Sequence, residues 1–166
     1  FVFGFLTYML FAFTLVNIHV VLPTYVHNFL EMRGNIYASA EVYYSIGAIL
    51  SGILVLRVFK SMNSLQAIII LMLVVAIAFY LMSWYKLIWV FFLGNLILGI
   101  TNAGVRILRT TFLFNNVPNN IIGRAGSVFG SLNIIVRMIM IGLFALPFFN
   151  LNENIRYAYL VGMVLM

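Results

Sequence analysis

The sequence predicts an all-α, polytopic transmembrane helix bundle with five complete spans and a truncated sixth. Apolar residues make up 65% of the 166 residues and charged residues only 7%, whereas soluble domains average about 45–50% and 25%. The charged residues also divide the chain into long apolar runs, five of which have at least the roughly 20 residues that a membrane helix needs. These runs are continuous rather than alternating, which favours helices over a barrel.

The first three predicted spans follow from the positions of charges and of one proline. Residues 1–30 carry no formal charge and form the first span, with a kink expected in its outer half at Pro23. The second is expected at about 35–56, with Glu41 near its start, and the third lies between Lys60 and Lys86. Each of these runs is long enough for one crossing.

The remaining spans are bounded in the same way. The fourth is expected at about 87–114, and the fifth at about 121–149 with Arg137 inside it. A sixth, at about 154–166, is too short to cross alone. Because the last run is cut off, residues 1–166 are expected to be one six-helix half-domain taken from a longer protein.

Basic residues gather on one predicted side of the membrane. The side that holds the loops after the second and fourth spans carries Arg57, Lys60, Arg106, Arg109 and Arg124. The other side carries Arg33, Lys86, Arg156, Glu31, Glu41 and Glu153. Lys and Arg mark the cytoplasmic face, so Phe1 is placed on the cytoplasmic side of the cell (inner) membrane. In so apolar a chain, the net charge of +6 indicates topology and anionic lipid rather than nucleic acid.

Small residues indicate where helices touch. The second span places Ser45, Ala48 and Gly52 on one face, with Gly47 and Ser51 offset from it. The fifth carries Gly123, Ser127, Gly130 and Ser131. Small residues let membrane helices approach closely, so both sets are interpreted as packing faces.

Two segments at matching topological positions resemble motifs of the major facilitator superfamily. After the second span, four residues fit the superfamily's loop signature Gly-x-Leu-x-Asp-Arg-x-Gly-Arg-Arg, namely Gly52, Leu54, Arg57 and Lys60. Leu56 stands in place of the acid, so a charge-relay role for this loop does not carry over. Before the fifth span, Pro118, Gly123, Arg124, Val128 and Phe129 resemble the Pro-x4-Gly-Arg-x3-Val-Phe junction of efflux-type members. Basic residues at any cytoplasmic helix end are the simpler alternative for the first segment.

The resemblance implies an efflux-type secondary transporter, of which this chain would be helices seven to twelve. Its partners would be the lipid bilayer, the N-terminal half of the transporter, a small-molecule substrate and, through exchange, protons. Gating at the cytoplasmic side would involve Gly52, Arg57, Lys60, Arg106 and Arg124. No cofactor is implied.

Polar residues inside the spans give the candidate substrate site. Asn17 in the first span, Asn95 and Asn102 in the fourth and Asn133 in the fifth each belong to a stripe of polar or small residues at helical spacing. Because polar groups facing lipid are costly, these stripes should face protein or a water-filled cavity. Hydrogen bonds between neighbouring helices are an equally good interpretation of the asparagines.

Arg137 is the most informative single residue. It follows Arg124 by thirteen residues, or about 20 Å of helix, which is too deep for easy access to the cytoplasmic side. No acid of this chain is expected at its depth. A substrate anion, a carboxylate of the other half or a nearby helix end would therefore balance the charge, and Arg137 is expected to face a central cavity.

Other function classes fit the sequence less well. The chain has no cysteine, no paired carboxylates at depth and no Ser-His-acid set, so we expect neither an enzyme nor a metal site. A channel should carry rings of polar groups or a selectivity loop, which are missing. The main alternative to a transporter is a non-transporting membrane interaction or assembly protein with a transporter-like fold.

Overall fold

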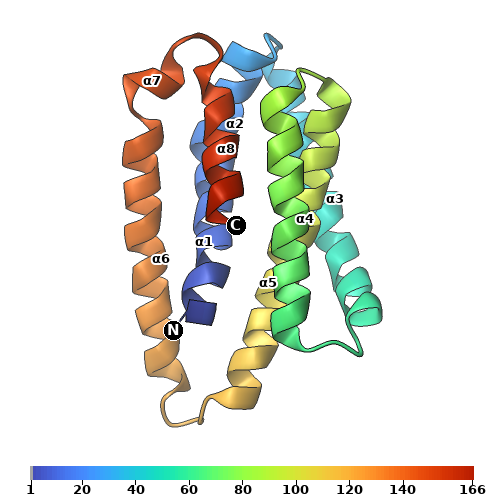
Figure 1. Ribbon diagram of the computed structural model, residues 1–166, viewed down its shortest axis with the longest axis vertical. Coiled ribbons are helices and arrows are strands. Elements are labelled where there is room, and N and C mark those ends of the chain that lie inside the picture. Colours follow the sequence, from blue (N-terminus) through green and yellow to red (C-terminus); the bar gives the residue numbers. More distant parts are fainter. Residues whose placement is uncertain (1) are drawn as a thin grey trace.

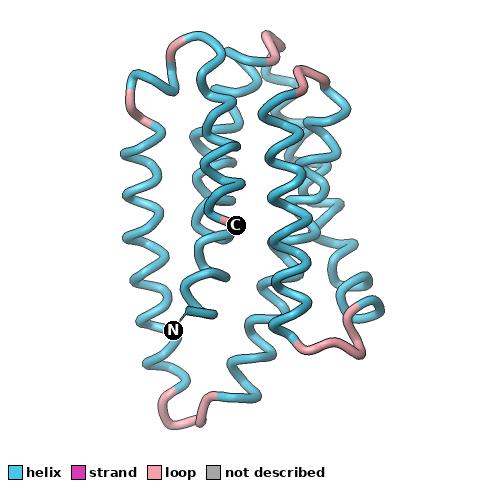
Figure 2. The backbone as a smooth tube through the Cα atoms, in the orientation of Figure 1, coloured by secondary structure: helices cyan, strands magenta, loops and turns pink. Residues whose placement is uncertain are grey.

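Helices account for nearly all of the described chain. The computed structural model describes the backbone of residues 2–166 and the side chains of residues 7–55, 57–151 and 153–166; Phe1 and the side chain of Leu56 lie outside this set. Within the described residues there is no strand, and the connections between the long helices are short (Figures 1 and 2). The predicted all-α bundle is confirmed.

Five helical segments are long and apolar enough to cross a membrane: Thr7–Phe29, Gly34–Val55, Ser64–Trp84, Ile88–Asn116 and Ile122–Phe144. The corresponding long helices are α1 (Val2–Val16), α3 (Gly34–Val58), α4 (Ser64–Trp84), α5 (Ile88–Asn116) and α6 (Ile122–Phe144). The chain then turns through α7 (Pro147–Asn150) and a 3₁₀ turn, η3 (Asn152–Ile155), into α8 (Arg156–Leu165). The five predicted spans are therefore confirmed, and α8 is the short sixth helix.

The first span is irregular at and around its proline. Two π-helical segments, η1 (Asn17–Val21) and η2 (Tyr25–Phe29), lie on either side of α2 (Leu22–Thr24), which contains Pro23. The Leu22 N–H donates to the Asn17 carbonyl five residues earlier, and the next residue is Pro23, which has no N–H to give. The second half of this span thus departs from regular α-helix, as Pro23 predicts.

The fifth span ends earlier than predicted. Helix α6 stops at Phe144, because Leu146 is held in an extended conformation (φ −58°, ψ 142°) before Pro147. A residue that precedes proline is disfavoured in the helical region. The predicted end at residue 149 was wrong for this reason.

Each long helix packs against one or more others. Helix α5 lies against both α3 and α4, α8 lies against α4, and α6 lies against α1 (Figure 1). A buried aromatic cluster joins α1, η2, α4 and α8, and its members are Phe13, Tyr25, Phe79 and Tyr159. Large apolar side chains on the outward faces of α3, α4 and α6 are exposed, as lipid-facing residues are in a membrane protein.

Helices α3 and α5 approach most closely at two glycines. A Cβ atom on Gly47 would collide with the carbonyl oxygen of Leu96, and one on Gly99 would collide with the carbonyl oxygen of Tyr44. The contact face of α3 is thus the one that carries Gly47 and buried Ser51. Of the predicted face, Ala48 lies at this contact, since its backbone nitrogen would be 3.0 Å from a Cβ on Gly99, but Gly52 does not, since a Cβ there would meet open space.

Candidate functional site

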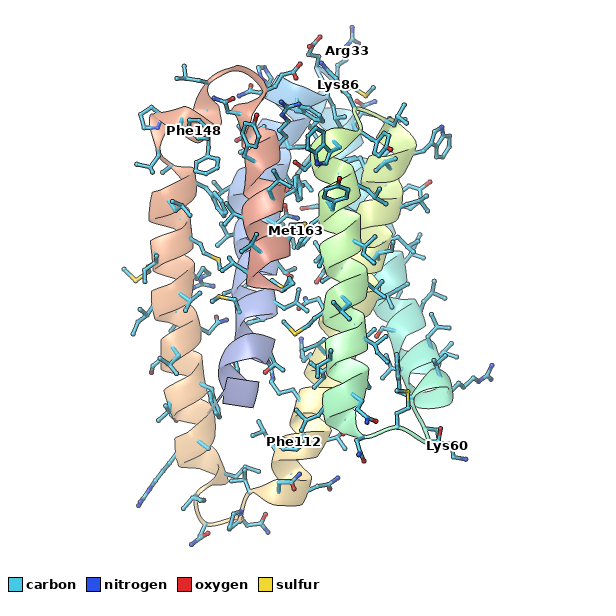
Figure 3. The ribbon with its side chains drawn as sticks, viewed as in Figure 1. Arg33, Lys60, Lys86, Phe112, Phe148 and Met163 are labelled. Atoms are coloured by element: carbon cyan, nitrogen blue, oxygen red, sulfur yellow. The ribbon has the colours of Figure 1, made fainter. Side chains whose placement is uncertain are left out.

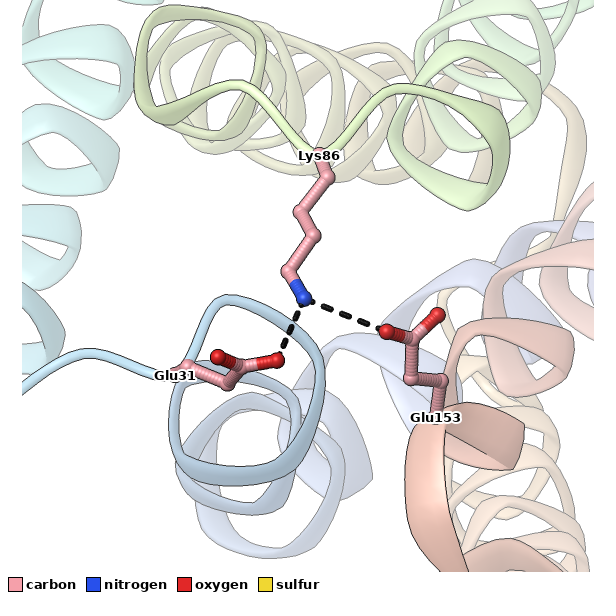
Figure 4. Close-up of polar contacts among 3 residues, drawn as sticks. All are labelled: Glu31, Lys86 and Glu153. Atoms are coloured by element: carbon pink, nitrogen blue, oxygen red, sulfur yellow. Dashed lines mark hydrogen bonds and ion pairs between the residues drawn. The ribbon is translucent and has the colours of Figure 1, made fainter.

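The charged side chains divide between the two ends of the molecule. Glu31, Lys86 and Glu153 meet at one end, which we call the outer end, where Lys86 Nζ lies 2.6 Å from Glu31 Oε1 and 3.1 Å from Glu153 Oε1 (Figure 4). Hydrogen bonding from Lys86, together with its charge, lowers the pKa of Glu31 from its ordinary value of 4.5. The same two carboxylates raise the pKa of Lys86. We call these three residues the outer clasp.

The opposite end carries basic residues without acids among its described residues. Lys60 lies at this end and Arg33 and Lys86 at the outer one (Figure 3). The predicted gating residues with basic side chains are all exposed here: Arg57, Lys60, Arg106 and Arg124. Gly52, the remaining one, is half-buried with open space beside its Cα. Among described residues these basic side chains form no ion pair.

Arg137 lies inside the α6 span. It follows Ile122 by fifteen residues and precedes Phe144 by seven, which puts it about 22 Å and about 10 Å from those ends. Its side chain is half-buried, and it makes no hydrogen bond or ion pair with any described residue. It follows buried Asn133 by four positions, so the two residues lie on one face of α6.

The asparagines of the predicted site have different surroundings. The amide nitrogen of Asn133 donates to the Tyr8 carbonyl on α1 (3.0 Å), and that of Asn102 donates to the Tyr44 hydroxyl on α3 (2.7 Å). Asn95 donates to the Phe91 carbonyl of its own helix. Two of these side chains therefore hold neighbouring helices together, and they point toward different neighbours.

Asn17 is the exception among the four. It is fully buried (0% exposed), and neither its amide nitrogen nor its amide oxygen has a hydrogen-bond partner among the described residues. It is also the first residue of η1, where the α-helical hydrogen-bond pattern changes. A buried amide without partners carries a desolvation cost of about 1–3 kcal/mol, and π-helical turns are frequent at functional positions.

Three tyrosines were not anticipated from the sequence. The Tyr8 ring stacks on Phe129 of α6 and lies under the guanidinium of Arg109 of α5, 3.9 Å from its Cζ. Tyr8 therefore joins α1, α5 and α6. Tyr44 accepts the Asn102 hydrogen bond described above. In an apolar run these residues resemble any other core aromatic, so the sequence carries no signal for them.

The third is Tyr37, which joins α3 to the irregular first span. Its hydroxyl donates to Glu41 Oε1 (2.6 Å) and lies 3.4 Å from the Ile18 carbonyl oxygen. In the π-helical register of η1, the N–H that would serve Ile18 belongs to residue 23, which is proline. Tyr37 thus lies beside Glu41 and beside the Ile18 carbonyl, which lacks a helical N–H donor because residue 23 is proline.

No match to this chain is found among protein-family models, curated proteins or solved structures. Among the described residues, no group of three or more histidines and acids could hold a metal ion. The arrangement offers unpaired cationic and amide groups inside apolar helices. Chemically, such groups are suited to hydrogen bonding or ion pairing with a polar or anionic group.

Proposed function

We propose that this chain is one half of a secondary transporter that moves a small solute by alternating access. The observation that carries the proposal is Arg137, a half-buried arginine within a span that has no acidic partner among the described residues. A charge at such depth costs a few kcal/mol or more and by default marks a substrate path or a buried pair. An anionic group of the solute, or a carboxylate of the other half, would balance it.

The irregular first span supports the same proposal. Transporter sites lie near the middle of the bilayer and are formed by interrupted helices, whose polar groups are free to meet a ligand. Buried Asn17 has both amide groups unused at the beginning of η1. Under the proposal, Asn17 and Arg137 contact the solute, whereas Asn102 and Asn133 hold the helices that carry them.

The resemblance to the major facilitator superfamily supplies the rest of the proposal. The chain would be helices seven to twelve of an efflux-type member and would pack against an N-terminal half. The end with Arg57, Lys60 and Arg124 would face the cytoplasm, because basic residues mark that side. Proton exchange would drive transport in this scheme.

Transport by proteoliposomes that hold both halves tests the proposal. The probes are radiolabelled small carboxylates and organic phosphates, since Arg137 calls for an anion. We expect Arg137→Ala to lower the uptake rate by roughly tenfold or more, because losing the partner of a desolvated charge costs several kcal/mol. Arg137→Lys should restore only part of it, since lysine lacks the planar fork of donors.

Arg33→Ala is the matched control. It removes the same charge from an exposed side chain at the outer end, so uptake should stay within about twofold of the unmodified rate, as expected for an exposed surface charge. Normal uptake by the Arg137→Ala variant would refute the site. A variant that no longer folds would be recognised by its loss of a single peak in size-exclusion chromatography.

A non-transporting assembly protein is the second candidate. The observation that favours it is the use of Asn102 and Asn133 for hydrogen bonds between helices, which suits a rigid scaffold. The same liposome assay separates the two proposals. A correctly folded protein that transports none of the probes, but that binds another membrane protein, would favour the scaffold.

A further inference from the structure

Helix α5 is longer than a bilayer requires. Its 29 residues span about 43 Å, against about 30 Å for the hydrocarbon core. Its neighbour α4 has 21 residues, or about 31 Å, and runs up to the outer end where α5 begins. If α4 matches the core, residues of α5 after about 108 extend into the headgroup layer, and Arg106 lies at its boundary.

A groove of about 460 Å³ follows the exposed face of α5 at this level. It is lined by Arg106, Ile107, Thr110, Thr111, Phe114 and Asn115. Ile107 and the exposed Phe114 give it an apolar side, whereas Arg106 and Asn115 have donor groups that no described residue occupies. The two threonine hydroxyls donate to carbonyls one turn back, so their oxygens remain available within the groove.

The charge at this end is not balanced within the described chain. Arg109, three residues after Arg106, is only 8% exposed and packs on the Tyr8 ring without an acidic partner among the described residues. Residues three apart on a helix are neighbours, so the two guanidinium groups repel each other. Of the described acids, Glu31 and Glu153 belong to the outer clasp, and Glu41 lies within the first third of α3, which begins close to Glu31 in the chain. An anion from outside the chain is the remaining source of compensation.

We infer that the groove on α5 binds the headgroup of an anionic phospholipid, with Arg106 contacting its phosphate. Three features of the groove match such a lipid. It lies at the level of the headgroup layer, it has an apolar side next to a cationic side chain, and a second positive charge, Arg109, is held nearby by Tyr8. Arginine is suited to phosphate because its donors form a planar fork. Arg106 is also one of the predicted gating residues, but lipid binding in this groove does not depend on the transport proposal.

Lipid titration by native mass spectrometry tests the inference on the purified chain in detergent. We expect phosphatidylglycerol to bind at least about fivefold more tightly than phosphatidylcholine, since one basic residue near the surface contributes about that factor. Arg106→Gln should abolish the preference. Arg57→Gln makes the same charge change at an exposed side chain of α3, outside the groove. It should leave the preference for phosphatidylglycerol within about twofold of that of the unmodified chain.

Three results would overturn the inference. Equal binding of the two lipids would mean that the groove does not select anionic headgroups. An equal effect of Arg57→Gln and Arg106→Gln would mean a diffuse attraction without a site. Displacement of phosphatidylglycerol by millimolar inorganic phosphate or glycerol phosphate would assign the groove to a soluble anion instead. Arg106 is exposed and has no described partner, so folding should survive either substitution.

Discussion

Two buried tyrosine hydroxyls differ in their surroundings and therefore in what they contribute to the stability of the fold. Tyr25 and Tyr159 lie edge to face in the aromatic cluster, with ring centroids 4.8 Å apart, and both are fully buried. The Tyr25 hydroxyl donates to the Met82 carbonyl at 2.6 Å and so ties η2 to the end of α4. The Tyr159 hydroxyl has no partner among the described residues. One hydroxyl is satisfied and the other is not.

This contrast gives a prediction at the residue scale. Tyr25→Phe should lower the free energy of unfolding by about 1 kcal/mol, because it removes a hydrogen bond and leaves the Met82 carbonyl unpaired. Tyr159→Phe, its matched control, removes an unsatisfied hydroxyl and should be neutral or stabilising. Unfolding in mixed micelles with increasing denaturing detergent measures both. Equal destabilisation by the two substitutions would contradict the hydrogen-bond account.

The sequence predicted the type of residue at the candidate site better than the contacts there. It placed Arg137 and Asn133 on one face of the fifth span, and in the structure Asn133 contacts Tyr8 of α1. It left open whether the asparagines bind substrate or neighbouring helices. For Asn133 and Asn102 the partner is a backbone carbonyl or a tyrosine on another helix. Such a partner depends on how helices rotate against each other, which periodicity does not determine.

At the scale of elements, the crossing of α3 and α5 is set by backbone contact. Gly47→Ala should separate the two helices, since its methyl group would meet the Leu96 carbonyl, and overpacking of this kind costs about 1–3 kcal/mol. Gly52→Ala, five residues further along the same helix, adds a methyl group to open space and should be neutral or slightly stabilising. Thermal unfolding of the two variants in detergent gives the comparison. If Gly52→Ala is the more harmful, the packing face is the one first expected from the sequence.

The helices themselves were predictable because hydrophobicity and length decide them. The five spans appear near their expected positions, and Pro23 correctly marks the irregular part of the first. Two π-helical segments were not predictable, because a switch from four-residue to five-residue hydrogen bonding depends on packing around Tyr25 and Asn17 rather than on composition. Packing, and not composition, also decides that Gly47 rather than Gly52 lies at the contact between α3 and α5.

At the scale of the whole molecule, the outer clasp joins three connections that are distant in sequence. Glu31 follows η2, Lys86 lies between α4 and α5, and Glu153 belongs to η3 (Figure 4). The first span and α8 are thereby fastened to the hairpin of α4 and α5. The clasp therefore holds the outer ends of these helices together as one unit.

The clasp predicts a pH-dependent stability with a definite sign. The pKa of Glu31 is lowered in the folded protein, so its contribution is complete above the ordinary value of 4.5 and is lost as the pH falls through the lower folded value. The pKa of Lys86 is raised from its ordinary value of 10.5, so its contribution is present below that value and is lost as the pH rises through the folded one. Between these limits the clasp should be fully formed.

Thermal unfolding in detergent between about pH 3 and pH 7 tests this at the acid limit, where protonation of Glu31 removes its stabilising charge. Glu31→Gln should lower the midpoint temperature at pH 7 but have little effect at pH 3, so the pH dependence becomes flatter. High salt should reduce the difference at pH 7, because the three side chains are exposed and their charges are screened. Arg33→Gln, at the same end and without a described partner, is the control and should leave the slope unchanged. A Glu31→Gln variant with the unmodified pH profile would mean that the ion pairs contribute nothing to holding the outer end together.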